Sequence, residues 1–228
     1  MKDTALSMDI TPKVAIRLSG TGGQGLLLAG RILAEAAAIY DGLNVVQSNS
    51  YGPEARGGAS RSEVVMSRGE VDDLRCRTFD ILICLSQKAC DSYYADLMER
   101  GILIVDSTNV AVVPTSRAVE VPMTKMAVEE CGDRMTTNII ALGVLCGYSG
   151  VVTLKALNSA LQSSLRKDLL ERNKKALKLG YDAGKEIAER TPDKKRSGLR
   201  DFSFIREPAP AGKDHRKNGR GKVHAVAG

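Results

Sequence analysis

Short runs of β-branched and aliphatic residues alternate with longer helix-forming segments along this chain. Residues 13–18 (KVAIRL) form the first run and end in a glycine-rich turn, and residues 26–40 then supply helix formers without proline. This order predicts a strand, a turn and a helix. Similar runs predict further strands at 44–47, 61–66, 80–85, 102–105 and 118–121.

Helical patterns occupy the spaces between and after these runs, and they predict helices at 88–100, 123–130, 138–148, 154–165 and 168–189. Strands that alternate with helices are typical of a parallel sheet with crossover connections. The 228 residues are 43% hydrophobic and contain no Trp, which suits one core built from aliphatic side chains. We therefore expect the α/β class, as a single Rossmann-like domain with a mostly parallel sheet flanked by helices.

Charge is concentrated at the C-terminal end. Residues 191–228 hold ten Lys or Arg and four Asp or Glu, and removing these from the totals of 33 and 27 leaves 23 of each before them. The composition divides the chain into an N-terminal extension (1–12), a neutral body (13–190) and a basic tail (191–228). Rich in Pro, Gly and charge, the tail is predicted to be disordered.

The basic tail has two interpretations. It is either solubilising or linker-like, or it contacts nucleic acid or an acidic partner through counterion release; we favour the first, so nucleic acid is not the expected partner. The short apolar cluster DFSFI (201–205) is a candidate for docking on another subunit.

The cysteine spacing and the hydropathy of the chain argue against iron–sulfur proteins and membrane proteins. The cysteines form no C-x-x-C pair, which argues against a redox motif or an iron–sulfur cluster, and we expect reduced, mostly buried thiols at Cys76, Cys84, Cys90, Cys131 and Cys146. No segment reaches the roughly 18 apolar residues that span a bilayer, and the start has no apolar signal core. We expect a cytoplasmic protein that does not contact the membrane.

The candidate chemistry begins at the turn that follows the first strand. It fits G-x-G-x-x-G between a strand and a helix, with the residues Gly20, Thr21, Gly22, Gly23, Gln24 and Gly25. Glycine lets the backbone adopt positive φ and approach a ligand, and the free N–H groups of a helix start attract anions. A phosphate group is the expected ligand.

Three alternatives to this phosphate site differ in what they require. A dinucleotide site needs an acidic residue at the end of the second strand, but that strand ends in Gln47 and Ser48, which disfavours NAD and FAD. A tight turn without a ligand stays open. Catalysis by this chain is disfavoured, because its histidines, His215 and His224, both lie in the tail and no metal-binding or P-loop pattern is present.

Two motifs in fixed order carry a family resemblance. The turn GTGGQG is followed by QSNSYGPEARGGASRSEVV, and the similarity continues through DILICLSQKACDSY, GILIVDS and TTNIIALG. In these motifs the chain resembles gamma subunits of 2-oxoacid:ferredoxin oxidoreductases (the pyruvate/ketoisovalerate oxidoreductase gamma family), and SYGPEARGG resembles their 2-oxoglutarate branch. The long basic tail departs from the family.

The resemblance implies a non-autonomous enzyme subunit. Partner alpha and beta subunits would bind thiamine diphosphate with Mg, and a ferredoxin-like subunit or ferredoxin would carry iron–sulfur clusters. The complex would convert a 2-oxoacid to acyl-CoA by oxidative decarboxylation. This subunit would help to bind coenzyme A and to assemble the complex, so neither catalytic residues nor metal ligands are expected in it.

Carried over onto this sequence, the coenzyme A site would comprise the turn 20–25 and a second loop. In that loop Arg56 would contact phosphate or form a subunit salt bridge, Gly57 and Gly58 would allow close approach, and Tyr51 and Glu54 would face the same cleft, with packing as the alternative for Tyr51. Gln24 would hydrogen-bond a ligand or partner. Two further candidates follow predicted strands or begin helices, Ser86 and Asn138, and either is also suited to cap a helix, which we favour for Asn138.

Three functions follow. The favoured one positions coenzyme A for attack on a thiamine-bound acyl group by proximity and orientation. The alternatives are a purely structural subunit of the same complex, and a stand-alone nucleotide-binding protein whose tail binds nucleic acid.

Overall fold

The computed structural model describes residues 12–50, 59–69, 71, 76–191, 202–205 and 223–227, and it contains one mixed sheet. The order of strands across the sheet is β6-β5-β4-β1-β3-β2-β7. Their bounds are β1 Lys13–Thr21, β2 Asn44–Ser50, β3 Ala59–Ser67, β4 Phe79–Cys84, β5 Leu97–Asp106, β6 Val119–Val121 and β7 Val223–Ala227. Four neighbouring pairs are parallel, and β3 is antiparallel to both its neighbours. The expected α/β fold with a mostly parallel sheet is confirmed.

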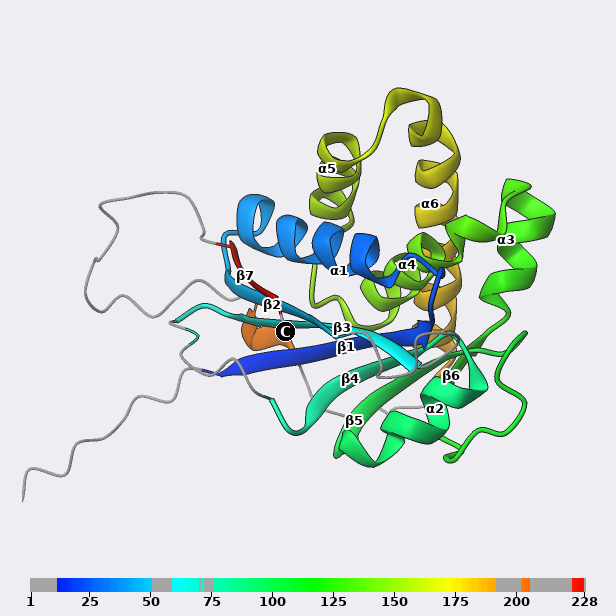
Figure 1. Cartoon of the computed structure of the whole chain (residues 1–228), viewed down its shortest axis with the longest axis horizontal. Helices are drawn as coiled ribbons and strands as arrows, with labels where there is room; N and C mark the ends of the chain where they lie inside the picture. The colour runs from blue at the N-terminus through cyan, green and yellow to red at the C-terminus, as the bar shows by residue number, and fades with distance from the viewer. Residues whose placement is uncertain are drawn as a thin grey trace, which may run out of the picture.

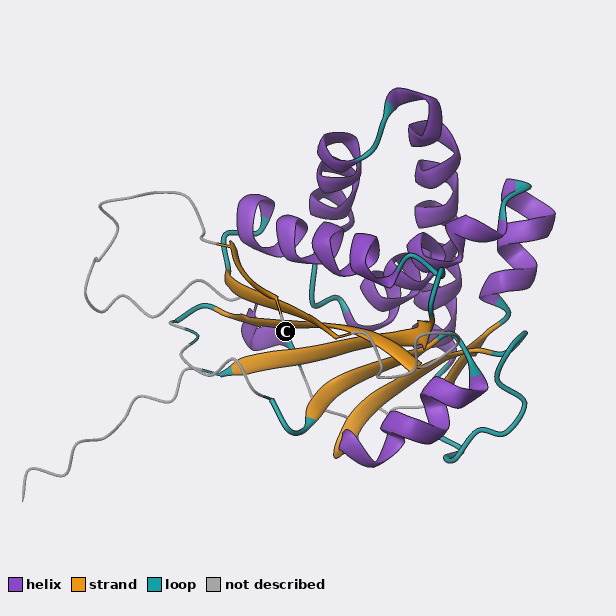
Figure 2. Cartoon of the chain, in the orientation of Figure 1, coloured by secondary structure: helices purple, strands orange, loops and turns teal. Residues whose placement is uncertain are grey.

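The helices lie mainly on one face of this sheet (Figures 1 and 2). That face carries α1 Leu26–Glu35 with its π-helical continuation Ala36–Tyr40, α3 Met123–Cys131, α4 Thr137–Ser149, α5 Leu154–Ser164 and α6 Lys167–Arg190. The opposite face carries α2 Gln87–Tyr93, which continues as the 3₁₀ turn Tyr94–Asp96. Further 3₁₀ turns span Arg134–Thr136 and Ser203–Ile205. No helix in these ranges is both long and apolar enough to cross a membrane.

Strands β1 and β4 form the topological switch point of the sheet. They are parallel neighbours, yet the chain leaves β1 through α1 on one face and leaves β4 through α2 on the other (Figure 1). In open α/β sheets the crevice at such a point, beyond the carboxyl ends of the strands, is where ligands bind. The glycine-rich turn follows β1 directly and therefore lies at this crevice.

Alternation along the strands divides the core between the two faces. Ile81 and Ile83 of β4 pack with the helices of the crowded face, whereas Leu82 and Cys84 pack under α2. All five cysteines are free thiols, and Cys84, Cys90 and Cys146 are buried, as the sequence predicted.

Helices α4 and α6 approach each other through glycines. A side chain on Gly143 or Gly147 of α4 would collide with the backbone of α6, and one on Gly180 or Gly184 would collide with the backbone of α4. Small residues at such positions let two helices pack backbone to backbone, in place of the wider spacing that larger side chains require.

The predicted C-terminal end of the helix at 88–100 is wrong. Helical structure stops at Asp96, and residues 97–100 begin β5, where Leu97 pairs with Phe79 of β4. Gly101 lets β5 pass close to its surroundings, since a Cβ there would lie 2.9 Å from the Met98 carbonyl oxygen and 3.0 Å from that of Asp80. Pairing with β4 thus overrides the helical propensity of this segment.

Parts of the predicted disordered tail are described with contacts. Phe202 and Ile205 are 4% and 2% exposed and belong to the main core, so the expectation that this cluster docks on another subunit is corrected: burial in its own chain already removes these side chains from water. Val223–Ala227 forms β7 beside β2. Most other tail residues lie outside the described part of the chain.

Candidate functional site

The turn at the end of β1 has the open backbone that an anion site requires. Gly23 and Gly25 have φ of 88° and 70°, values that disfavour other residues. Gly22 and Gly23 are exposed, and nothing lies within 4 Å of the position of a Cβ on either. Both positive φ values agree with the role that the sequence assigned to these glycines.

The turn also presents unused hydrogen-bond donors. Within the described residues, the N–H groups of Gly22, Gly23 and Gly25 have no acceptor, and α1 begins without a side-chain cap. Each helix start carries roughly half a positive charge from its aligned peptides. The turn can therefore accept an anion such as a phosphate group.

Gln24 is occupied inside the chain. Its Oε1 accepts a hydrogen bond from the Thr21 N–H at 2.7 Å, and its Nε2 donates to the Leu85 carbonyl oxygen at 3.1 Å. Each end of the carboxamide thus has one partner inside the chain, and a contact of Gln24 with a ligand or a partner subunit stays a prediction. Gly20 is required beside it, because a Cβ there would collide with Gln24 Oε1.

Asn138 reaches the same turn from the first turn of α4. Its Nδ2 donates to the Gly25 carbonyl oxygen at 2.9 Å, and a Cβ on Gly25 would collide with that amide. The interpretation of Asn138 as a helix cap is wrong, because the cap position of α4 is Thr136. Among the described atoms, Asn138 Oδ1 is buried without a hydrogen-bond partner.

Ser86 caps α2. Its Oγ accepts a hydrogen bond from the Ala89 N–H at 3.3 Å, which is the capping alternative weighed for this residue. It still lies at the carboxyl end of β4, but its side chain serves the helix.

A polar network that the sequence analysis missed extends this edge of the sheet. Asp106, at the end of β5, accepts hydrogen bonds from the N–H and Oγ1 of Thr124 and from Asn109 Nδ2. Thr137, beside Asn138, approaches Thr124 with 3.5 Å between the two Oγ1 atoms. An aspartate directly after an aliphatic strand was the available signal.

The second motif is anchored at the same edge. Tyr51, Glu54, Arg56, Gly57 and Gly58 lie outside the described residues. Their flanks do not: Ala59 pairs with Thr21, and Ser50 pairs with Arg61. Both ends of the loop that carries these candidates therefore start from the edge of the sheet where the glycine-rich turn lies.

The position of β3 argues against a dinucleotide site. It lies between β1 and β2 and runs antiparallel to both. The neighbour of β1 on this side is thus not the parallel strand that would end in a ribose-binding carboxylate. This adds a topological reason to the missing acidic residue after Gln47.

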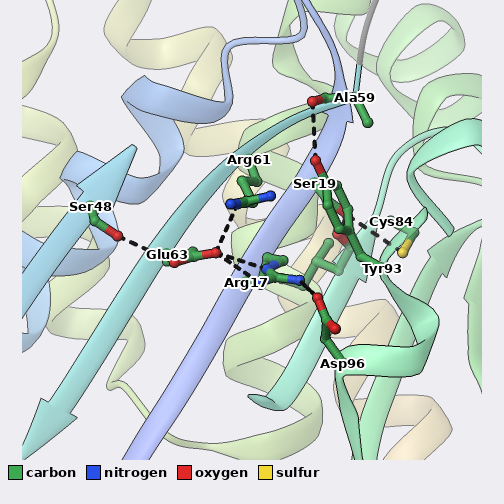
Figure 3. Close-up of polar contacts among 10 residues, drawn as sticks. Arg17, Ser19, Ser48, Ala59, Arg61, Glu63, Cys84, Tyr93 and Asp96 are labelled. Atoms are coloured by element: carbon green, nitrogen blue, oxygen red, sulfur yellow. Dashed lines mark hydrogen bonds and ion pairs between the residues drawn. The ribbon is translucent and has the colours of Figure 1, made fainter. Parts of the chain in front are cut away.

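On the α2 face of the sheet, Arg17 is the centre of a charged cluster that the sequence analysis also missed (Figure 3). The guanidinium forms ion pairs with Glu63 and Asp96, and it stacks on Phe79 at 3.9 Å and Tyr93 at 4.8 Å from the ring centroids. Only 5% of the Arg17 side chain is exposed. The cluster holds the middle of β1 to β3 and α2 and stabilises the strand that carries the turn.

Cys84 of β4 and Cys90 of α2 share a hydrogen bond that raises the pKa of Cys84 and lowers the pKa of Cys90. A hydrogen bond with Cys90, followed by burial, raises the pKa of the Cys84 thiol well above its ordinary value of 9.0. A buried thiol of raised pKa is a poor nucleophile. Within the described ranges, moreover, no group of three His, Cys, Asp or Glu side chains is placed to hold a metal ion.

Comparison with known sequences identifies relatives over most of the chain. Residues 15–183 match the family model described as pyruvate ferredoxin/flavodoxin oxidoreductase. The 2-oxoglutarate synthase subunit KorC of Methanocaldococcus jannaschii is 44% identical over 179 residues, which cover 75% of this chain and 94% of that protein.

Solved structures agree. The gamma subunit of a keto/oxoacid ferredoxin oxidoreductase from Geobacter sulfurreducens matches with a TM-score of 0.70 at 44% identity, over 76% of this chain and 97% of that one. The 2-oxoglutarate:ferredoxin oxidoreductase of Magnetococcus marinus, with 2-oxoglutarate, coenzyme A and succinyl-CoA bound, matches with a TM-score of 0.69 over 79% of this chain and 32% of that one. At 22% identity the second likeness shows the fold alone.

Proposed function

Because the chain belongs to the pyruvate ferredoxin/flavodoxin oxidoreductase family, as a gamma subunit of a 2-oxoacid:ferredoxin oxidoreductase, we propose that its glycine-rich turn binds a phosphate group of coenzyme A. The oxoacid in this proposal is 2-oxoglutarate, which the name of the relative from Methanocaldococcus jannaschii supports. Partner alpha and beta subunits would supply thiamine diphosphate with Mg, and a ferredoxin-like chain or ferredoxin would take the electrons.

One observation carries the coenzyme A proposal: three backbone N–H groups within four residues are open to a ligand oxygen at the switch point. Among the described residues, the N–H groups of Gly22, Gly23 and Gly25 have no acceptor, and no atom lies within 4 Å of a Cβ built on Gly22 or Gly23. Backbone donors that are fixed before binding hold a phosphate group without further ordering. Arg56 stays a candidate for a second, charged phosphate contact.

The chemistry assigned to this subunit is positioning. The chain has just two histidines, both after residue 190, and the cysteine beneath α2 is held neutral. Holding coenzyme A in one orientation lowers the entropic cost of its reaction with an acyl group on a partner subunit. The gamma subunit would thus lower the KM for coenzyme A and leave acid–base chemistry to its partners.

Gly22→Val in the assembled complex tests this proposal. Gly22 has no positive φ, and its Cβ would meet nothing within 4 Å, so the fold tolerates a side chain there while the ligand does not. We expect the KM for coenzyme A to rise at least about tenfold, the loss of about 1.4 kcal/mol of binding, with the KM for the oxoacid unchanged. Arg56→Ala is expected to add to this effect.

Gln162→Val is the control, because it places the same apolar side chain at an exposed position of α5, which packs on the far end of α1 from the turn. It should leave both KM values unchanged. If Gly22→Val also leaves the KM for coenzyme A unchanged in an intact complex, the subunit is structural and the proposal fails. Loss of salt-dependent nucleic-acid binding on truncation after Arg190 would instead favour the third function.

A further inference from the structure

One side chain spans the crevice between β1 and β4. Gln24 accepts from the Thr21 N–H at the end of β1 and donates to the carbonyl oxygen of Leu85, the residue that follows β4. The last backbone contact between the two chain segments is the bond from the Leu85 N–H to the Ser19 carbonyl oxygen, at 2.9 Å. Gln24 thus continues the pairing of the two strands one step beyond their ladder.

The surroundings of Gln24 are shaped to hold it. Gly20 leaves the room for Oε1, and a Cβ there would also come within 3.3 Å of Leu85 Cβ. The Gln24 backbone N–H donates to the Thr21 carbonyl oxygen at 3.3 Å. Gln24 therefore forms hydrogen bonds with both backbone polar groups of Thr21, the N–H and the carbonyl oxygen. Its side chain joins β1 to the end of β4 at the edge where an open α/β sheet binds ligands.

The hydrogen bonds of Gln24 determine which backbone N–H groups of the turn are free to bind a ligand. Because the Thr21 N–H is bonded to Gln24, the donors of the turn that have no acceptor among the described residues are those of Gly22, Gly23 and Gly25. We propose that Gln24 is a positioning residue: its carboxamide holds the turn in the conformation that accepts the phosphate group, and it does not itself touch the ligand. This inference rests on the proposed function, since it acts through the site assigned there to coenzyme A.

Gln24→Met in the assembled complex removes both hydrogen bonds and adds no charge. The turn then loses its link to Leu85, and part of the binding free energy is spent on ordering it. We expect the KM for coenzyme A to rise about tenfold, which is the loss expected for two hydrogen bonds of ordinary strength. The kcat at saturating coenzyme A and the KM for the oxoacid should stay within about twofold of wild type.

Gln24→Glu supplies a readout that packing alone would not move. A protonated carboxyl group has the same shape as a carboxamide, accepts from the Thr21 N–H and donates to the Leu85 carbonyl oxygen, whereas the carboxylate cannot donate. We expect the Kd of the complex for coenzyme A to be raised at about pH 8 and to return toward the wild-type value only near about pH 4, where a carboxyl group of ordinary pKa, about 4.3, is largely protonated. Gln24→Met should show no such recovery.

Other ionisable groups must be allowed for in this titration. Several elements meet at or pack near the turn. Their ionisable residues are Lys13 and Arg17 on β1, Arg61 and Glu63 on β3, Asp80 and Cys84 on β4, Arg31 and Glu35 on α1, Lys88, Cys90, Asp91 and Tyr93 on α2, and Cys146 and Tyr148 on α4. All are unchanged in the variant, and so are the phosphate groups of coenzyme A. The wild-type complex titrated over the same range therefore serves as the reference.

The outcomes separate the two proposals. A Gln24→Met complex with wild-type KM for coenzyme A, or a Gln24→Glu complex that does not recover at low pH, overturns the inference. If this happens while Gly22→Val still raises the KM, the proposed function survives alone. If Gly22→Val has no effect, the site is not at the turn and both proposals fail. The Gln24→Glu comparison uses one protein at two pH values, so it stays decisive even where Gln24→Met does not assemble.

Discussion

The side-chain amide of Asn138 donates a hydrogen bond of 2.9 Å to the carbonyl oxygen of Gly25, and so joins the start of α4 to the end of the glycine-rich turn. Gly25 has φ of 70° and no room for a Cβ beside this amide. The point at which α1 begins is therefore fixed from two sides, by its own glycine and by a residue of α4.

Replacing Asn138 tests how much this bond stabilises the fold. Asn138→Ala removes a buried donor and leaves a small cavity, and we expect the free energy of unfolding to fall by about 1 to 3 kcal/mol. Asn173→Ala is the control, because Asn173 makes a similar bond, to the Leu169 carbonyl oxygen, from an exposed position on α6. Chemical denaturation that gives equal losses for the two variants would contradict the assigned role.

The contact between α4 and α6 gives a second prediction. Gly180→Ala places a methyl group against the Ile140 backbone, and overpacking of this kind costs about 1 to 3 kcal/mol. Gly22→Ala makes the same change where nothing lies within 4 Å, and should alter stability by less than about 0.5 kcal/mol. Thermal unfolding of both variants measures the difference, and an equally stable Gly180→Ala would show that the helices can separate freely.

Arg17 gives a third prediction. Arg17→Met takes from Glu63, whose side chain is 15% exposed, its buried partner and leaves it paired with Arg61 alone. Breaking a fully buried pair costs about 3 to 5 kcal/mol, and we expect a loss toward the lower end of this range. Arg31→Met is the control because it breaks the exposed pair with Glu35 on α1, which is expected to contribute about 0 to 1 kcal/mol. If the double variant Arg17→Met/Glu63→Leu is no more stable than Arg17→Met, the loss does not come from the Glu63 carboxylate.

Cys84 predicts a dependence of stability on alkaline pH. The hydrogen bond with Cys90 and burial raise the pKa of Cys84 in the folded chain, so the fold favours the neutral thiol. Its contribution to stability is fully present below the ordinary pKa of 9.0 and is lost as the pH rises toward the higher pKa of the folded chain. Denaturation at about pH 7.5 and 10 should show a larger decline for wild type than for Cys84→Ala; parallel declines would refute the assignment.

The sequence predicted the strand, turn and helix over 13–40 because hydrophobic period and glycine position are local signals. It could not predict that β3 runs antiparallel between β1 and β2, since a run such as 61–66 carries no mark of strand direction. It failed at 97–100 for the same kind of reason: the pairing of Leu97 with Phe79 decides the structure there.

The site was predicted in part. The glycines of the turn were recognised because positive φ selects glycine, and Gly23 and Gly25 have it. The partners of Gln24 and Asn138 were missed, since they lie 61 and 113 residues away along the chain. Arg17 was passed over within an apolar run, because its partner Glu63 becomes a neighbour only once the sheet forms.

These long separations also set an order of events during synthesis. The glycine-rich turn leaves the ribosome before β4 and α4 do, so its link to β4 has to wait for Leu85 and its link to α4 for Asn138. Contacts between distant residues form late, because their loops must close first. A nascent chain that stops before Asn138 would thus contain the whole motif without its fixed shape, and binding competence at the turn would mark a subunit whose folding is nearly complete.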